Sequence, residues 1–453
     1  MQGLFGTDGV RGTAGRYPLD APTVRRLGAA LARVLQKDGH RARVLAGRDT
    51  RESGIWIERE LAIGVTSQGG ALVSTGVIPT PAVAYLTPLM AYTAGVVISA
   101  SHNPFEDNGI KVFSGTGEKL TETLERQVEA VIADRSWSVD DPHAPTTHQG
   151  PEIEQIDYRA EYLAHLVQIV QPSDWNRSVR LAIDCANGAT TTVAPQLFQA
   201  LGFEARCIGD EPNGRNINLH CGSTDPALLA RTVVEGGYRL GIAYDGDGDR
   251  AIFVDAAGRV VDGDAVMLMC AKQMKREGRL ADDALVATVM SNIGLEIALR
   301  SEGIEMVRCA VGDKYVMEEM AKRGLSLGGE QSGHVIFSDY LFTGDGLATS
   351  LQVLRTMAAT GRELADLASD LTSFPQVLLN VRVGRRVDLK TIPAVADVMS
   401  TVESRLAGHG RLLVRYSGTE PLLRVMLEGR DEGDIRRWGQ EIVDAVVDHI
   451  GSH

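Results

Sequence analysis

Three aspartates at alternate positions, in Asp245-Gly-Asp-Gly-Asp249-Arg250, form the loop whose residue types and spacing most directly suggest chemistry. The two glycines let the backbone fold so that the carboxylates converge. Two full charges about 4 Å apart repel one another by on the order of 4 kcal/mol at an effective dielectric constant near 20. A hard divalent cation makes this convergence favourable, and Mg²⁺ suits a site of few carboxylates plus a phosphate. The loop therefore predicts one Mg²⁺ ion, held by Asp245, Asp247 and Asp249.

The same loop has two other interpretations, a solvated acidic turn and a calcium-binding EF-hand. A solvated acidic turn would need no metal. A calcium-binding EF-hand needs glycine where Arg250 stands and glutamate where Ala256 stands, so the sequence disfavours it.

A second stretch, Gly95-Val-Val-Ile-Ser-Ala-Ser-His-Asn-Pro104, places Ser101 just beyond an apolar run that is typical of a buried strand. The Asn-Pro pair predicts a turn, and ligands of open α/β sheets bind at the carboxyl ends of the strands. We interpret Ser101 as a nucleophile that carries a phosphoryl group. A capped turn without chemistry and a serine hydrolase are the alternatives, but no Gly-x-Ser-x-Gly surrounds Ser101. A carboxylate metal loop also fits phosphoryl transfer better than acyl transfer.

A third stretch, Arg415-Tyr-Ser-Gly-Thr-Glu-Pro421, is typical of an anion cradle. Hydroxyls and a backbone amide can donate to phosphate oxygens, and an arginine can bind two such oxygens at once. The alternative is an ordinary hairpin turn with a surface arginine. The candidate phosphate-binding residues are Arg415, Ser417, Gly418, Thr419 and Arg424.

Weaker signals come from a polar loop of small residues, Gly328-Gly-Glu-Gln-Ser-Gly-His334. Glu330 and Ser332 could bind sugar hydroxyls, and His334 could move a proton. A structural turn with a buried histidine explains the same loop. Gly6-Thr-Asp-Gly-Val-Arg-Gly12 and Gly47-Arg-Asp-Thr-Arg51 are suggestive only.

The elements that must position these loops alternate between helix and strand. Apolar residues recur at helical spacing over 24–34 and 55–65, with Asp20 as a possible cap, and apolar runs at 44–46, 71–73 and 96–98 predict strands. This alternation predicts a parallel sheet with right-handed crossovers.

The same alternation continues after a polar boundary at 136–152. A second α/β unit spans about 155–256, and a third begins near 260, with a strand at 284–288 and a helix from Leu295. Beyond Pro375, an alternating strand at 377–383, two strands around 416–419 and a final amphipathic helix predict a small α+β domain.

Composition limits the class of protein. The 453 residues suggest roughly three domains, and the net charge of −13 argues against nucleic acid and anionic membranes as partners. Five scattered cysteines without a CxxC pair fit reduced thiols. No apolar run reaches the roughly 20 residues of a membrane span, and the N-terminus lacks signal-peptide features, so we expect a cytoplasmic protein.

Taken together, the four main motifs resemble the α-D-phosphohexomutase superfamily along essentially the whole chain. Ile98-Ser-Ala-Ser-His-Asn-Pro104 resembles its phosphoserine loop and Asp245–Arg250 its metal loop. Glu330-Gln-Ser-Gly-His334 resembles its sugar loop, and Arg415–Pro421 its phosphate loop.

The opening Phe5-Gly-Thr-Asp-Gly-Val-Arg-Gly12 and the stretch Pro212-Asn-Gly-Arg-Asn-Ile-Asn218 are similar to the branch that acts on glucosamine phosphates. Ile98-Ser99 and Gln331 are also similar to that branch. Gln331 stands where phosphomannomutase/phosphoglucomutase relatives usually carry methionine.

The resemblance implies three related α/β domains with mixed sheets and a smaller C-terminal α+β domain of the TATA-box-binding-protein-like type, around a central cleft. We expect the domains at 1–152, 153–256, 257–372 and 373–453, with the phosphoserine, metal, sugar and phosphate loops in that order.

The implied activity interconverts glucosamine 6-phosphate and glucosamine 1-phosphate, a supply step for UDP-N-acetylglucosamine and cell-wall precursors. Ser101 would carry the phosphate and complete the Mg²⁺ site, and a sugar 1,6-bisphosphate would be the intermediate. Lys111 and His334 are the acid and base candidates, in an order left open, and Arg250 adds positive charge.

Two other functions stay open at this point. One is a phosphomannomutase or phosphoglucomutase of the same superfamily. The other is a non-catalytic phosphosugar-binding protein, against which the intact Ser101 and three aspartates argue. The expected partner is a phosphosugar, with neither nucleic acid nor membrane, and the chain would act as a monomer or homodimer.

Overall fold

The computed structural model describes residues 3–6, 8–36, 41–134, 136–137, 139, 151–169, 179–406, 408–417 and 422–451. The chain forms two compact units, one of Met1–Met290 with Ile304–Asp370 and the other of Ser291–Gly303 with Leu371–His453. Most of the expected boundary at 136–152 lies outside the described residues. None of the described helices is long and apolar enough to cross a membrane.

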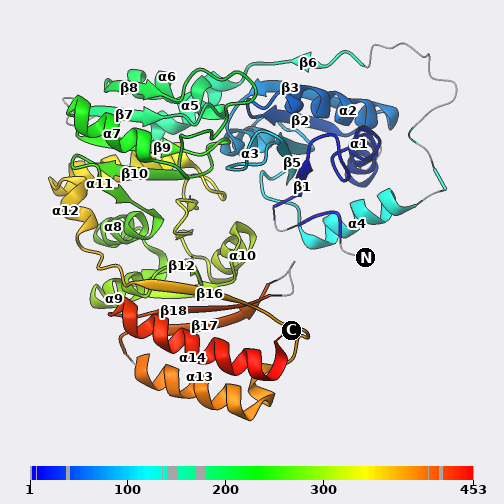
Figure 1. Ribbon diagram of the computed structural model, residues 1–453. Helices are drawn as coiled ribbons and strands as arrows, with labels where there is room; N and C mark the ends of the chain where they lie inside the picture. The colour runs from blue at the N-terminus through cyan, green and yellow to red at the C-terminus, as the bar shows by residue number, and fades with distance from the viewer. Residues whose placement is uncertain are drawn as a thin grey trace. The chain divides into compact units, whose positions relative to one another are not determined.

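The first sheet of the larger unit is mixed (Figure 1). Its strand order is β1-β5-β4-β2-β3-β6, and the three strands expected at 44–46, 71–73 and 96–98 run parallel at its centre, as predicted. β5 and β1 add an antiparallel edge. The strands are β1 (Val10–Thr13), β2 (Arg43–Arg48), β3 (Ala71–Val77), β4 (Ala94–Ile98), β5 (Asp107–Ser114) and β6 (Glu154–Gln155).

Helices α1 and α2 of this first domain lie side by side because glycines allow their backbones to approach closely (Figure 1). A Cβ at Gly28 would lie 2.4 Å from the Leu61 carbonyl oxygen, and one at Gly64 would lie 2.0 Å from that of Arg25. The expected cap is present, because the Asp20 carboxylate accepts a hydrogen bond from Thr23 N. The helices are α1 (Ala21–Leu35), α2 (Ser53–Ser67), α3 (Thr80–Leu89) and α4 (Glu122–Ala133).

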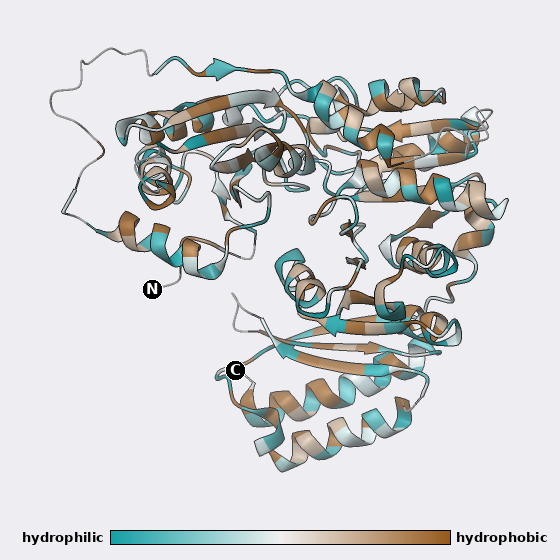
Figure 2. Ribbon diagram, turned by 180° about the vertical axis from the view of Figure 1, so that it is seen from behind, coloured by the Kyte–Doolittle hydropathy of each residue, from teal (hydrophilic) through white to brown (hydrophobic). Residues whose placement is uncertain are grey.

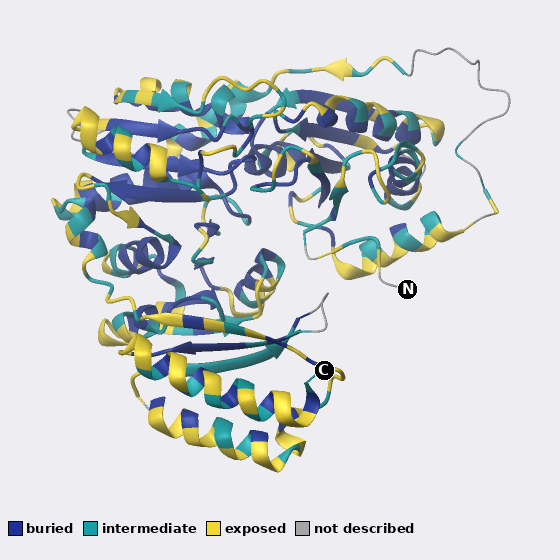
Figure 3. Cartoon of the chain, viewed as in Figure 1, coloured by how far each residue is buried: buried dark blue, intermediate teal, exposed yellow. Residues whose placement is uncertain are grey.

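The second sheet has the order β11-β10-β9-β7-β8. β7, β8 and β9 are parallel, and β9 turns back into the antiparallel β10, so the acidic loop is the tip of a hairpin. Both hairpin strands are buried throughout (Figure 3). The elements are α5 (Arg159–Gln168), β7 (Arg180–Asp184), η2 (Ala189–Thr192), α6 (Ala194–Ala200), β8 (Glu204–Ile208), α7 (Ala227–Gly236), β9 (Leu240–Tyr244), β10 (Ala251–Asp255) and β11 (Val260–Val261).

The third sheet has the order β13-β12-β14-β15, with β12 parallel to β13 and β14. The β14–β15 hairpin carries the loop with Glu330 and His334 at its tip. The elements are α8 (Gly263–Arg276), η3 (Ala281–Asp283), β12 (Ala284–Thr288), β13 (Glu305–Cys309), α10 (Asp313–Arg323), β14 (Leu327–Gly329), β15 (Val335–Phe337), α11 (Gly346–Thr360) and α12 (Leu364–Ala368).

The smaller unit contains an antiparallel sheet of order β16-β18-β17. Teal and brown residues alternate along its last helix, as an amphipathic helix requires (Figure 2), and Ile435, Ile442 and Val446 are buried as expected. The helix expected from Leu295 begins two residues earlier, because the Asn292 side chain caps it by accepting from Gly294 N. The elements are α9 (Ile293–Ser301), β16 (Gln376–Arg382), η4 (Leu389–Thr391), α13 (Pro393–Leu406), β17 (Arg411–Tyr416), β18 (Leu422–Glu428) and α14 (Glu432–Ile450). Three α/β domains and a smaller α+β domain confirm the expected fold class.

Candidate active site

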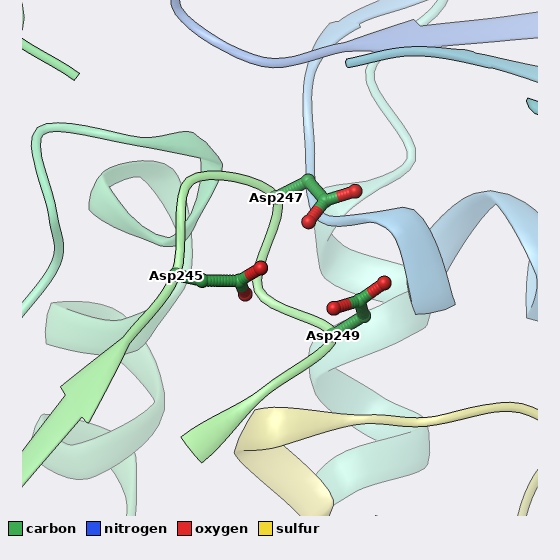
Figure 4. Close-up of side chains that lie close together, drawn as sticks. All are labelled: Asp245, Asp247 and Asp249. Atoms are coloured by element: carbon green, nitrogen blue, oxygen red, sulfur yellow. The ribbon is translucent and has the colours of Figure 1, made fainter. Parts of the chain in front are cut away.

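The three aspartates of the β9–β10 hairpin converge as their spacing predicts (Figure 4). Each offers a carboxylate oxygen within 4.8 Å of the others, and all three side chains are buried. Among the described residues, Asp247 Oδ1 and Asp249 Oδ1 have no hydrogen-bond partner. Buried, unpartnered carboxylate oxygens at this spacing fit a cation, so the residues present could hold a metal ion.

Ser101 reaches this cluster from the first domain. It follows β4, is 1% exposed, and its hydroxyl donates a 2.5 Å hydrogen bond to Asp245 Oδ2. Its backbone lies in the left-handed region, with φ of 53°. A non-glycine residue in that region stores backbone strain of about 1–3 kcal/mol, which functional sites often contain. The two strongest sequence motifs therefore meet at one point.

A buried arginine holds the Ser101 loop in place. Arg51 is 1% exposed and donates to the carbonyl oxygens of Ser101 and Asn103 at 3.0 and 2.9 Å. Its Nε lies 3.1 Å from Asp49 Oδ2, and the same carboxylate oxygen accepts a 2.6 Å bond from the Ser99 hydroxyl. Residues 47–51 were only a suggestive motif in the sequence, because nothing in one sequence places them beneath the serine loop.

Lys111 lies between the aspartates. Its Nζ donates to Asp247 Oδ2 at 2.9 Å and Asp249 Oδ2 at 3.0 Å, and it lies 3.3 Å from Asp8 Oδ2. Burial acts to lower the pKa of Lys111, but these carboxylates outweigh it and hold the pKa well above its usual range. Lys111 is therefore an ammonium group in this geometry, able to neutralise charge or donate a proton.

His334 also faces the metal loop. Its Nδ1 lies 3.6 Å from Asp249 Oδ1, and its Nε2 lies 3.8 Å from Asp313 Oδ2. Burial acts to lower the pKa of His334, but Asp249 and Asp313 raise it above its usual value. The ring packs flat against Gly344, where a Cβ would lie 2.4 Å from the imidazole. This histidine is buried, yet it belongs to the site and not only to the turn.

A cavity of about 450 Å³ opens beside these groups, within the larger unit. Arg250 lines it, with its Nε 3.8 Å from Asp249 Oδ1, and so does Glu330, whose Oε1 accepts a 3.2 Å bond from Gly312 N. Ser332, on the same loop as Glu330, is exposed and is not part of the lining. The charged lining residues are Asp8, Arg11, Asp249, Arg250, Asp313, Glu330 and His334.

Several residues of the site had little or no sequence signal. Asp8 and Arg11 lie in the weak glycine-rich motif near the N-terminus. Thr80 donates its hydroxyl to Asp247 Oδ2 at 2.6 Å, and Lys119 forms ion pairs with Asp8 and Asp313. No local pattern marks a threonine at a helix start or a lone lysine, because their role arises from the packing of one domain on another.

The candidate phosphate loop belongs to the smaller unit. Arg415 and Arg424 face one another across β17 and β18, and Ser417 is buried beyond the strand end. Gly418 and Thr419 lie outside the described residues. Two arginines on neighbouring strands place positive charge near the hairpin end, which suits an anion.

Four family models match the chain in order. They describe the phosphoglucomutase/phosphomannomutase domains and cover residues 2–138 (alpha/beta/alpha domain I), 160–258 (domain II), 262–374 (domain III) and 378–445 (C-terminal domain). The described α/β domains thus follow the family's order.

Two relatives decide the branch. The phosphoglucosamine mutase of Syntrophotalea carbinolica is 48% identical over 450 residues, which cover 99% of this chain and 98% of that protein. The phosphoglucosamine mutase of Geobacter sp. (strain M21) is also 48% identical, over 100% of this chain and 99% of that protein. This chain belongs to the phosphoglucosamine mutase family. It is a mutase, an enzyme of the isomerase class, and the resemblance predicted from the motifs is confirmed.

Solved structures of more distant proteins share the fold of this phosphoglucosamine mutase family member. A phosphoglucomutase/phosphomannomutase family protein from Burkholderia thailandensis has a TM-score of 0.79 at 22% identity, with both chains covered completely. An N-acetylphosphoglucosamine mutase from Aspergillus fumigatus, in complex with GlcNAc-6P and magnesium, has a TM-score of 0.66 at 17% identity and covers 98% of this chain and 95% of its own.

Proposed function

We propose that this enzyme interconverts glucosamine 6-phosphate and glucosamine 1-phosphate through a phosphate carried on Ser101. The observation that carries the proposal is the hydrogen bond from the Ser101 hydroxyl to Asp245, inside a cluster of three buried aspartates. A serine hydrolase would instead need a neighbouring general base free of such a cluster. The pKa of the adjacent His102, lowered to about 4 by burial and by nearby arginines, makes that residue a weak base.

The metal that suits this cluster is Mg²⁺. Asp245, Asp247 and Asp249 would hold it, together with an oxygen of the phosphate on Ser101. When bound, Mg²⁺ would neutralise the charge on the transferring phosphoryl group. The magnesium-containing complex of the Aspergillus N-acetylphosphoglucosamine mutase is consistent with this choice.

The reaction consists of two phosphoryl transfers, each of a different phosphoryl group. The bond from Ser101 Oγ to phosphorus breaks while the sugar O1 of the 6-phosphate forms a new one, which gives the 1,6-bisphosphate. The bisphosphate then turns over in the site, and its 6-phosphoryl group passes to Ser101 Oγ as the bond from phosphorus to the sugar O6 breaks, which leaves glucosamine 1-phosphate. The hydroxyl that attacks must lose its proton, and the oxygen that leaves must gain one.

Lys111 and His334 would move these protons. Lys111 is in contact with Asp247 and Asp249 on the Ser101 side, and His334 lies on the cavity side. A group that accepts the sugar proton in one direction returns it in the other, so each can act as acid and base in turn. Arg250 adds positive charge at the cavity wall.

The sugar and the idle phosphate need their own contacts. Glu330 lines the cavity and would accept hydrogen bonds from sugar hydroxyls, with Ser332 on the same loop. Arg415, Ser417 and Arg424 would bind the phosphate that does not react, together with Gly418 and Thr419.

Intact-mass measurement and kinetics test the function. We expect purified wild-type protein to carry about 80 Da of extra mass, the size of one phosphoryl group, and Ser101→Ala to lose both this mass and turnover. Ser369→Ala, at an exposed serine, is the matched control. Turnover of Ser101→Ala near the wild-type rate would contradict the nucleophile.

Substrate comparison tests the branch. The value of kcat/KM should be highest for glucosamine phosphates among the glucosamine, glucose and mannose phosphates. A preference for mannose 6-phosphate would instead favour a phosphomannomutase.

A further inference from the structure

We infer that Asp313 recognises the ammonium group at C2 of the amino sugar, and so sets the preference for glucosamine over glucose phosphates. The inference rests on the proposed function. Asp313 is the first residue of α10 and lines the cavity beside Glu330 and His334. Asp313 is 8% exposed, so a charge bound there would be well shielded from water.

The carboxylate of Asp313 already binds an alkylammonium group. Lys119 Nζ forms ion pairs with Asp313 Oδ2 and, at 2.6 Å, with Asp8 Oδ1. The ε-ammonium of lysine and the 2-ammonium of glucosamine are both primary ammonium groups with three donors. The Asp313 carboxylate therefore already accepts the kind of donor that the substrate group presents.

Asp313 has fewer cationic partners than Asp8, the other cavity carboxylate that Lys119 contacts. Asp8 contacts Arg11, Lys111 and Lys119, so three positive groups compensate it. For Asp313, the ion pairs among the described residues are those with Lys119 and, at the longer distance of 3.8 Å, with His334. One carboxylate has about four lone-pair positions, so Asp313 can accept a further donor.

The other cavity carboxylates have other tasks. Asp249 belongs to the metal cluster, and Glu330 would bind a sugar hydroxyl. Gly312 N donates to Glu330 Oε1 at 3.2 Å, which ties Glu330 to the residue just before Asp313. Glu330 and Asp313 are thus two acceptors on one cavity wall, which would bind neighbouring donors of the sugar ring, the C3 hydroxyl and the C2 ammonium.

The orientation of the Asp313 carboxylate is also fixed. Its Oδ1 accepts a 2.7 Å bond from Lys314 N, at the first turn of α10. Oδ2 contacts Lys119 Nζ and lies 3.8 Å from His334 Nε2, which lines the cavity. A neutral C2 hydroxyl can also donate to Oδ2, but a hydrogen bond between two charged groups is roughly twice as strong. The carboxylate charge should therefore favour the amine.

The test compares Asp313→Asn with the wild type on glucosamine 1-phosphate and glucose 1-phosphate. Asparagine keeps the shape and an acceptor oxygen but removes the charge. We expect kcat/KM for glucosamine 1-phosphate to fall about tenfold or more, and that for glucose 1-phosphate to change by less than about threefold. Glu318→Gln, an exposed charge removal on the same helix, should leave both values unchanged. Asp313→Glu keeps the charge and should retain part of the preference.

The outcomes separate the two proposals. An equal fall on both substrates, or an unchanged ratio of the two kcat/KM values in Asp313→Asn, would overturn the inference about Asp313. If Asp313→Asn does not fold, the same comparison is made with Asp313→Ala: a lower preference for the amino sugar supports the inference, and an unchanged ratio overturns it. A wild-type enzyme without preference for the amino sugar would instead overturn the proposed function itself.

Discussion

The Ser101 loop, with its left-handed backbone, is held by donors from its own domain and from the second domain. Arg51 of the first domain and Asn218 of the second each donate to the carbonyl oxygens of Ser101 and Asn103. Asn218 Nδ2 makes these bonds at 2.9 and 3.1 Å, and its own φ is 57°. The second domain therefore also contributes to the position of the Ser101 loop.

Replacement of Asn218 by glycine should lower kcat about tenfold with little change in KM, because one of two donors to each loop carbonyl is lost. Glycine tolerates the positive φ of this position but alanine does not. Asn218→Ala should therefore destabilise the folded protein by about 1 kcal/mol more than Asn218→Gly, through backbone strain. Steady-state kinetics measure kcat and KM. Intact-mass measurement gives the fraction of the protein that carries a phosphoryl group. Asn213→Gly, at an exposed position of the same segment, is the control. An unchanged kcat in Asn218→Gly would show that Arg51 alone positions the loop.

At the scale of elements, the metal loop depends on a helix from the next domain. Gly346 N, at the start of α11, donates to the Gly248 carbonyl at 3.0 Å. A Cβ at Gly346 would lie 2.5 Å from the Arg250 carbonyl oxygen, so this approach requires glycine. Asp345 caps α11 through Ala348 N and accepts a 2.8 Å bond from the Tyr162 hydroxyl. The start of α11 thus joins the metal hairpin to both α5 and the third domain.

The Asp345 cap predicts a pH-dependent stability. Burial raises the pKa of Asp345 to about 6 from its ordinary value of 3.8, although its hydrogen bonds oppose the shift. Between these two pKa values, Asp345 therefore keeps a proton in the folded protein that it has released in the unfolded chain. The free energy of unfolding falls as pH rises through this window. The full effect is about 3 kcal/mol.

Asp345→Asn should remove that part of the pH dependence. The amide oxygen can still cap α11, and the amide NH₂ can donate to the Tyr162 oxygen. Urea midpoints measured between about pH 4 and about pH 7 should fall in the wild type and fall less in the variant. Asp282→Asn, at an exposed aspartate, should follow the wild type. Parallel curves for wild type and Asp345→Asn would contradict the assignment.

Elements and local motifs were predictable where the signal lies in adjacent residues. The alternating aspartates, the Ser101 turn and the strands at 44–46 and 96–98 follow from local spacing, and the structure contains them. Arg51 was only part of a suggestive motif and Thr80 was not identified, because a buried arginine beneath a loop and a threonine at a helix start depend on chain segments far away in sequence. The antiparallel edge formed by β1 and β5 likewise depends on a pairing between distant segments.

At the scale of the whole molecule, the first and third domains meet through opposite charges at the edge of the cavity. On α10, Lys314 Nζ lies 3.2 Å from Glu125 Oε2 and 3.7 Å from Glu122 Oε1, both on α4. The Lys314 and Glu125 side chains are only 14% and 17% exposed, so water screens this pair less than a surface pair. Because α10 begins with the cavity residue Asp313, this contact fixes the cavity wall relative to the first domain.

Charge reversal tests this contact. Glu125→Lys or Lys314→Glu alone places like charges together and should lower the free energy of unfolding by about 1 kcal/mol or more, with a higher KM for the sugar phosphate because the cavity wall shifts. The double variant restores opposite charges, so a double-mutant cycle should give a coupling energy of about 1 kcal/mol and KM should recover. The same exchange at Glu432 and Arg436, both exposed on α14, should couple by about 0.5 kcal/mol at most. Additive effects of Glu125→Lys and Lys314→Glu would mean that this ion pair does not help to hold the two domains together.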